Sequence, residues 1–244
     1  MTTRQIRGVD GRDELTYSDP KERTGVDSVP RPYSLQTTVR LARESGSTRY
    51  GYGKITNAVQ WEHTPIGLDV IAESAGLDEA LWSLQCVIPE QQPLALRFGQ
   101  LFSARVASAV LGNFESYRPG DERPRNAIRA TRQFAFGEIG DDDWDTARVA
   151  AQSAASDVDV PAGRCEAWNA ARAASGASPL DVAKAAAKST AWAAIHAVWN
   201  PDDDTLWEAN YAVAHAAAEA AMKSLFLSIL RGQVALDNPH AGAV

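Results

Sequence analysis

Apolar residues recur three or four positions apart along most of the chain, which is the spacing of one face of an α-helix. Together with residues that favour helix ends, this spacing predicts helices that start near residues 64, 78, 93, 121, 141, 161, 178 and 202. No segment combines strand-like alternation with a hairpin turn. We therefore expect an all-α fold, an array or bundle of about eight helices.

The stretch 121–139 carries the clearest helix signals in the chain. Asp121 is a good N-cap, and Pro124 suits the first turn, where its missing N–H costs nothing. Ile128 belongs to an apolar stripe that points inward, and Gly137 can adopt the left-handed conformation that ends a helix. This stretch also separates a mixed first half from an alanine-dominated second half.

The two ends of the chain lack this periodicity. Residues 1–32 are polar, charged and interrupted by Pro and Gly, and only a short helix over 34–45 interrupts the irregular pattern that follows. We therefore divide the chain into a polar N-terminal arm (1–60), a helical domain (61–232) and a frayed C-terminal tail (233–244). The arm is expected to be flexible, partly disordered or laid on the surface.

Charge and cysteine content narrow the function classes. The formal net charge is −7, which argues against nucleic-acid binding and favours a basic protein partner. Cys86 and Cys165 are far apart and have no metal-ligand spacing, and the N-terminus lacks a signal-peptide core. Lys184, Lys188 and Glu219 interrupt the alanine-rich runs, so no membrane span is expected. We expect a cytoplasmic protein without a cofactor.

One motif resembles a known family. Residues 123–138 read Arg-Pro-Arg-Asn-Ala-Ile-Arg-Ala-Thr-Arg-Gln-Phe-Ala-Phe-Gly-Glu, and alanine-rich helices follow. This pattern resembles the immunity proteins of bacterial polymorphic toxin systems and their phage-borne relatives. The resemblance extends over residues 61–230 and implies a helical protein that binds and neutralises a toxin or effector. One departure is that residues 150–156 lack the histidine usual in the helix after the motif.

The charged residues of this motif have two interpretations. Arg123 and Arg125 could form an anion or carboxylate site with Glu138, because arginine forks and helix N-termini both favour negative groups. Alternatively, Glu138 pairs with one of these arginines, or with another, and fixes the loops at the two ends of the helix. We favour the structural interpretation.

An acidic run offers a candidate metal site. Asp141, Asp142 and Asp145 fit D-D-x-x-D, the pattern that binds magnesium ions, and through them a diphosphate, in class I terpenoid synthases. Aspartates also favour helix N-termini, where this run and the run 202–204 both lie. We favour the helix-start interpretation and keep a magnesium-dependent, diphosphate-binding enzyme as the alternative.

Two histidines lie on the two long C-terminal helices. A break after residue 199 is expected to fold these helices antiparallel, which would bring His196 towards His215, with Glu219 one turn further on. A metal or acid–base site is conceivable from these residues. Histidines packed in helices are more often hydrogen-bonded to neighbours, and we favour that interpretation.

Three function classes follow from these patterns. The first is a non-enzymatic binding protein, similar to an immunity or phage accessory protein, that sequesters a basic toxin or effector. The second is the magnesium-dependent enzyme. The third is an assembly protein that forms homo-oligomers through exposed aromatic residues such as Trp61 or Trp207. We favour the first.

Overall fold

The structure, a computed structural model, describes residues 34–46, 62–158, 164–198 and 207–234, which all belong to one packed unit. Over these ranges it consists almost wholly of helices, so the all-α prediction is confirmed. The predictions for the first part of the arm, for Trp61, for the helix start at Pro161, for the aspartates at 202–204 and for the end of the tail lie outside the described residues.

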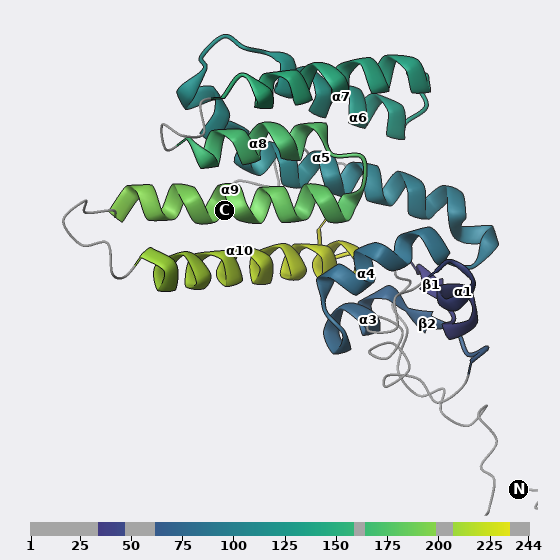
Figure 1. Cartoon of the computed structure of the whole chain (residues 1–244). Coiled ribbons are helices and arrows are strands. Elements are labelled where there is room, and N and C mark those ends of the chain that lie inside the picture. Colours follow the sequence, from purple (N-terminus) through teal and green to yellow (C-terminus); the bar gives the residue numbers. More distant parts are fainter. Residues whose placement is uncertain (1–33, 47–61, 159–163, 199–206, 235–244) are drawn as a thin grey trace, which may run out of the picture. The chain divides into compact units, whose positions relative to one another are not determined.

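Long helices dominate the described ranges (Figure 1). The α-helices are α1 (Val39–Glu44), α3 (Leu68–Ser74), α4 (Leu77–Ser83), α5 (Gln92–Tyr117), α6 (Arg123–Ala135), α7 (Asp141–Ser156), α8 (Cys165–Ser175), α9 (Pro179–Val198) and α10 (Trp207–Leu230). Two short 3-10 helices, η2 (Leu84–Cys86) and η3 (Pro89–Gln91), connect α4 to α5, and the two strands are β1 (Gln36–Thr37) and β2 (Ile66–Gly67).

A small antiparallel sheet ties the segment before residue 47 to the helices. β1 pairs with β2 so that Thr37 lies opposite Ile66, and the Thr37 hydroxyl donates a hydrogen bond to the Cys86 carbonyl. Val39 and Ala42 of α1 are buried in the same core as the long helices. The packed unit therefore begins N-terminal of the boundary that we placed at residue 61.

The same sheet changes the start of the next helix. The sequence places a helix start at Thr64 and Pro65, whereas α3 begins at Leu68 with Gly67 as its N-cap. The reason is that Ile66 and Gly67 extend to pair with β1 before the chain turns into the helix. A strand of two residues leaves no alternating pattern from which it could be predicted.

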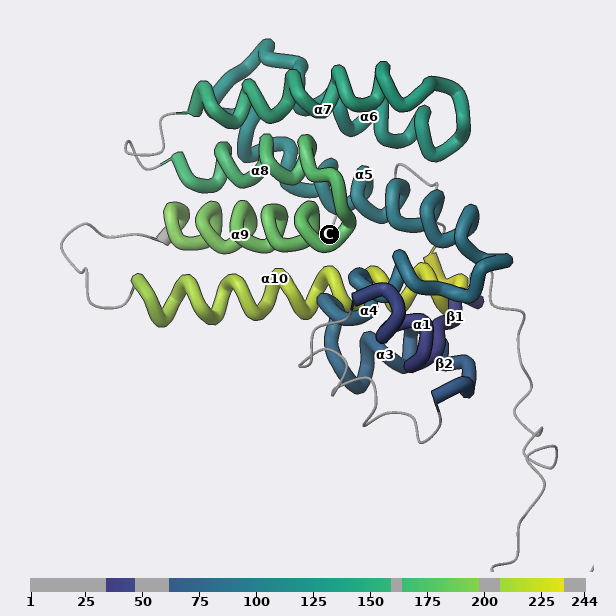
Figure 2. The backbone as a smooth tube through the Cα atoms, turned by 45° about the vertical axis from the view of Figure 1, so that its right-hand side comes forward, coloured from purple at the N-terminus to yellow at the C-terminus, as the bar shows by residue number. Residues whose placement is uncertain are grey.

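The long helices pack side by side. α5 contacts α6, α8 and α9, while α7 packs against α6 and α8. α10 packs mainly against α9 and touches α3 and α4 near its C-terminal end, and Figures 1 and 2 show α7, α8, α9 and α10 following one another in sequence order. Buried alanines fill α8 and α9, and their small side chains let neighbouring helices approach closely: Ala167, Ala170, Ala171, Ala174, Ala183, Ala186 and Ala187.

Three phenylalanines join α10 to the core. Phe226 of α10 meets Phe98 and Phe102 of α5 edge-on, with ring centroids 5.5 and 5.6 Å apart. All three side chains are fully buried. Edge-to-face pairs of this kind stabilise a core beyond the area that they bury. The C-terminal end of α10 is therefore anchored to α5.

Two of the described helical segments are long and apolar enough to cross a membrane by length and composition. They are Pro89–Tyr117, with 67% of its most apolar window buried, and Trp207–Leu230, with 22% buried. A core helix of a water-soluble protein satisfies the same criteria, so this is weak evidence for a membrane protein. The first segment is mostly buried among other helices, whereas the second lies at the edge of the array.

Candidate functional site

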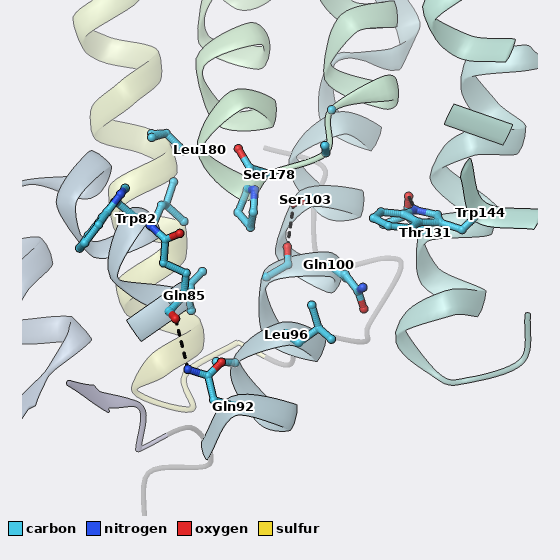
Figure 3. A pocket seen from close by; sticks show the side chains of 17 residues that line it. Trp82, Gln85, Gln92, Leu96, Gln100, Ser103, Thr131, Trp144, Ser178 and Leu180 are labelled. Carbon is cyan, nitrogen blue, oxygen red and sulfur yellow. Dashed lines mark hydrogen bonds between the residues drawn. The ribbon is translucent and has the colours of Figure 1, made fainter. Parts of the chain in front are cut away.

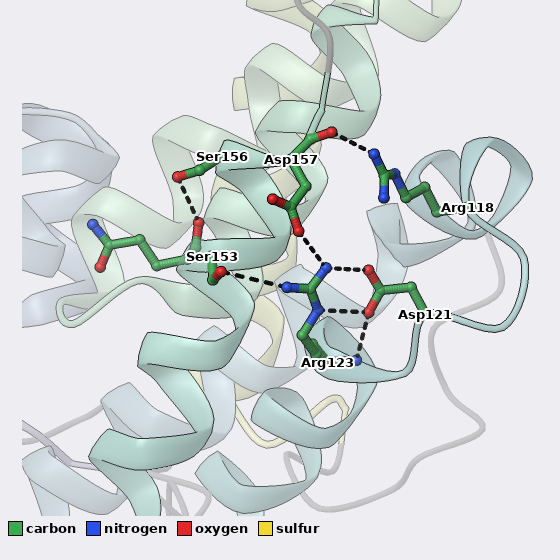
Figure 4. Close-up of polar contacts among 7 residues, drawn as sticks. Arg118, Asp121, Arg123, Ser153, Ser156 and Asp157 are labelled. Atoms are coloured by element: carbon green, nitrogen blue, oxygen red, sulfur yellow. Dashed lines mark hydrogen bonds and ion pairs between the residues drawn. The ribbon is translucent and has the colours of Figure 1, made fainter.

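Arg123, the first motif arginine, is the centre of a polar network at the start of α6 (Figure 4). Its Nε and Nη2 donate to the two carboxylate oxygens of Asp121 at 2.9 and 2.7 Å, and Nη2 also donates to Asp157 Oδ2 at 2.7 Å. Asp121 Oδ1 accepts the backbone N–H of Arg123 at 3.2 Å. The Asp121 side chain therefore caps the helix, although Glu122 occupies the N-cap position.

The ion pairs of this network shift the pKa values of Asp121 and Arg123. The hydrogen bond from Arg123 lowers the pKa of Asp121, and the two carboxylates raise the pKa of Arg123. Asp157 is the C-cap of α7, so the network joins the start of α6 to the end of α7. Arg118 adds a second link through the Asp157 carbonyl. The guanidinium of Arg123 is thus engaged by protein groups.

The other charged motif residues do not join this network. Arg125 Nε donates to Glu115 Oε1 of α5 at 2.9 Å. Glu138 is exposed and forms no ion pair among the described residues, so neither predicted arrangement of Glu138 with a motif arginine is present there. Gly137 has φ +73°, as predicted, and the Glu138 N–H closes the helix by donating to the Gln133 carbonyl at 2.9 Å.

The acidic run lies on the first turn of α7. Asp141 and Asp142 are exposed there, and Asp145 forms an ion pair with Arg148 at 2.6 Å. Within the described ranges, no three His, Cys, Asp or Glu side chains gather in a way that could hold a metal ion. The placement agrees with aspartates that stabilise a helix N-terminus. The magnesium site stays a prediction without a supporting contact.

The two histidines pair with different carboxylates. His196 Nδ1 lies 2.9 Å from Glu166 Oε2 of α8, whereas His215 Nδ1 lies 3.7 Å from Glu219 Oε1 on its own helix. Both histidines are partly buried. Each imidazole therefore lies beside a carboxylate, and the contact of His215 is longer than a hydrogen bond.

An aromatic cluster accompanies these histidines where α9 meets the first half of α10. The Trp192 ring lies 5.8 Å from His196, 6.1 Å from Trp207 and 5.1 Å from Tyr211, between centroids. Tyr211 in turn stacks on His215 at 5.7 Å. The sequence signal for this cluster is the spacing of four residues on two antiparallel helices, which brings the rings to one seam.

The thiol beside this cluster is not activated. Burial raises the pKa of Cys165, and the carboxylate of Glu166 raises it further. Burial also raises the pKa of Tyr211, with smaller contributions from Cys165 and Glu219. A nucleophilic cysteine needs the opposite shift, towards the thiolate. The pKa shift of Cys165 therefore disfavours the thiolate form.

The outward face of α10 is apolar and exposed. Val213 is 72% exposed, and Trp207 at the start of the helix is 39% exposed. The exposed residues that line this face at helical spacing carry no charge: Ala209, Val213, Ala216, Ala217, Ala220 and Ser224. Glu208 and Glu219 are exposed along one side of the stripe, and the half-buried Lys223 lies on the same side. We call this set of six residues the α10 face.

Two of the cavities between the described helices are similar in size. One, of about 540 Å³, lies among α4, α5, α6, α7 and the turn before α9 (Figure 3). The other, of about 530 Å³, lies among α5, α9 and α10 and has the buried Arg105 in its wall. Burial and the nearby Arg132 lower the pKa of Arg105. Neither cavity can be predicted from the sequence, because each depends on which helices pack against one another.

Comparison with known proteins adds no assignment. No family model, curated protein or solved structure matches this chain. The functional argument therefore rests on the residues themselves. The α10 face exposes uncharged helix surface, and the first cavity is lined by the side-chain amide of Gln100.

Proposed function

We propose that the protein is a non-enzymatic, cytoplasmic binding protein that sequesters a protein partner through the α10 face. The observation that carries the proposal is the exposure of the uncharged stripe along α10, with Val213 at its centre. Contiguous apolar surface on a folded protein is a feature of interaction sites.

The expected partner presents a helix or flat surface with small apolar residues and a basic rim. Alanines on α10 allow a second helix to approach closely, as they do inside α8 and α9. Glu208 and Glu219 beside the stripe favour Lys or Arg on the partner. The net charge of −7 would accelerate association with such a protein, and added salt would slow it.

A basic toxin or effector fits this description, so an immunity-like or phage accessory role remains our preferred biological setting. Sequestration requires only that the partner's working surface is covered, and it needs no catalytic group. The magnesium-dependent alternative has no supporting contact among the described acidic residues. A second copy of this chain is the competing occupant of the α10 face.

Site-specific photocrosslinking in the native host tests the proposal. A photoreactive amino acid at position 213 should yield a specific adduct with a basic protein, whereas one at position 149 should not. Val149 on α7 is a matched control because it is also exposed, at 64%. An adduct with a second copy would assign the face to self-association. Equal yields at both positions, or lipid adducts at position 213, would contradict the proposal.

A further inference from the structure

The cavity among α4, α5, α6 and α7 has mostly apolar walls and no charged side chain among the residues that line it. Two indoles, Trp82 and Trp144, lie on opposite sides of it in Figure 3. Leucines supply much of the remaining wall: Leu81, Leu84, Leu96 and Leu180. A volume of about 540 Å³ lies in the range of small-molecule sites.

Most polar groups in this wall already have partners in the protein. The Ser103 hydroxyl donates to the Gly99 carbonyl at 2.7 Å. Thr131 Oγ1 donates to the Ala127 carbonyl and accepts from Trp144 Nε1 at 3.1 Å. These groups help to hold the helices around the cavity, and they leave little capacity for a ligand.

Gln100 is different. Its side chain belongs to the buried face of α5 and is only 8% exposed, yet it forms no hydrogen bond with any described residue. Figure 3 shows its amide between Leu96 and Trp144, among the residues that line the cavity. Buried side-chain amides in folded proteins nearly always have a protein or water partner. An amide in this position is therefore set to bind a molecule that enters the cavity.

We propose that this cavity binds a neutral small molecule with a flat apolar body and a lactam or cis-amide edge. The carboxamide of Gln100 offers a donor and an acceptor side by side, and a lactam offers the complementary pair. The ligand carries no charge because no charged side chain lines the cavity. The site is separate from the α10 face, since no α10 residue lines it.

The test adds 2-quinolone, a flat bicyclic lactam, to the full-length protein. NMR signals of the side-chain amides report the binding. A dissociation constant of about 1 mM is expected for a fragment of this size, with the largest shift at the Gln100 amide. N-methyl-2-quinolone lacks the donor and should bind at least about tenfold more weakly. Absence of 2-quinolone binding, or equal binding of the methylated analogue, would overturn the proposal.

Two variants separate binding from folding. Gln100→Met keeps the length of the side chain and should lose binding at least about tenfold while its melting temperature stays equal or rises, because no hydrogen bond to a described residue is lost. Ala177→Phe, at an exposed position in the cavity wall, should block binding in a folded protein. The control is Gln152→Met, at an exposed position of α7 that does not line the cavity, which should bind normally. A lower melting temperature or unchanged binding in Gln100→Met would contradict the inference.

Discussion

α5 and α10 are alike in length and hydropathy but not in burial. Their most apolar windows have mean hydropathies of 1.2 and 1.3, yet 67% of the first and 22% of the second is buried. α5 is surrounded by α6, α8 and α9, whereas α10 packs mainly on α9. Two helices of similar hydropathy therefore differ in their surroundings: α5 fills the core, and α10 leaves one face exposed to solvent.

The difference lies in which apolar residues each helix carries. α5 buries large side chains such as Phe98, Phe102 and Phe114, whose exposure would cost much free energy. The outward face of α10 is mostly alanine, which loses little by contact with water. An alanine-rich helix can thus be exposed without destabilising the free protein and still offer a flat surface to a partner. The predictions below test this contrast.

The largest expected effect concerns a large side chain that joins the two helices. Phe226→Ala should lower the free energy of unfolding by about 3–5 kcal/mol, because it leaves a cavity between Phe98 and Phe102. Val213→Ala on the exposed side of the same helix should change it by less than about 0.5 kcal/mol. Urea denaturation measures both values. Similar losses in the two variants would show that the α10 face is buried.

Two glycines of α5 give a second matched pair. A Cβ at Gly99 would meet Pro179 Cγ at 2.9 Å, so Gly99→Ala should destabilise the protein by about 1–3 kcal/mol through overpacking against α9. Nothing lies within 4 Å of a Cβ at Gly112, so Gly112→Ala should stabilise the helix by about 0.5–1 kcal/mol. Thermal unfolding of the two variants should give shifts of opposite sign. A stabilised Gly99→Ala variant would mean that α5 and the start of α9 are further apart.

A buried hydroxyl links α5, α8 and α9. Ser189 Oγ donates to the Glu166 carbonyl at 2.8 Å and accepts from Asn113 Nδ2 at 2.9 Å. Ser189→Ala should lower the free energy of unfolding by about 1–2 kcal/mol, because the Asn113 amide loses its acceptor. Ser224→Ala on the exposed α10 face should have almost no effect. If chemical denaturation gave equal values for the two variants, the hydroxyl would contribute nothing to the core.

The smallest effect concerns the motif network. The pKa of Asp121 is lowered in the folded state, so this carboxylate contributes stability that is present above its unfolded pKa and is lost as the pH falls through the folded value. Asp121→Asn should therefore show a weaker loss of stability on acidification than the wild type. Melting temperatures measured between neutral and acidic pH provide the comparison. Parallel pH profiles would show that the ion pair with Arg123 contributes nothing.

Local signals explain which parts of the fold could be predicted. Gly137 ends α6 in the left-handed conformation because its sequence context is a helix terminus, and Ile128 is buried because it belongs to an apolar stripe. Asp121 caps the same helix through a contact two residues away. Each of these features depends on residues that are close together in the sequence, and it can therefore be predicted from the sequence.

Contacts between distant residues could not be predicted in the same way. Arg123 pairs with Asp157, 34 residues away, rather than with Glu138, because α7 returns its C-terminal end to the start of α6. The cavity around Gln100 likewise depends on which helices meet. A glutamine within the apolar pattern of α5 was the available signal, but only the packed structure shows that its amide has no partner among the described residues.

The claim that a partner binds the α10 face is tested most directly by calorimetry with purified proteins. The measured quantity is the affinity of the partner identified by crosslinking for two matched variants. Val213→Arg places a charge on the α10 face, and Val149→Arg places the same charge on the exposed side of α7. The account predicts a dissociation constant at least about tenfold larger for Val213→Arg and an unchanged value for Val149→Arg, with equal melting temperatures. Unchanged binding in Val213→Arg, or equal losses in both variants, would contradict the assignment of the α10 face as the partner surface.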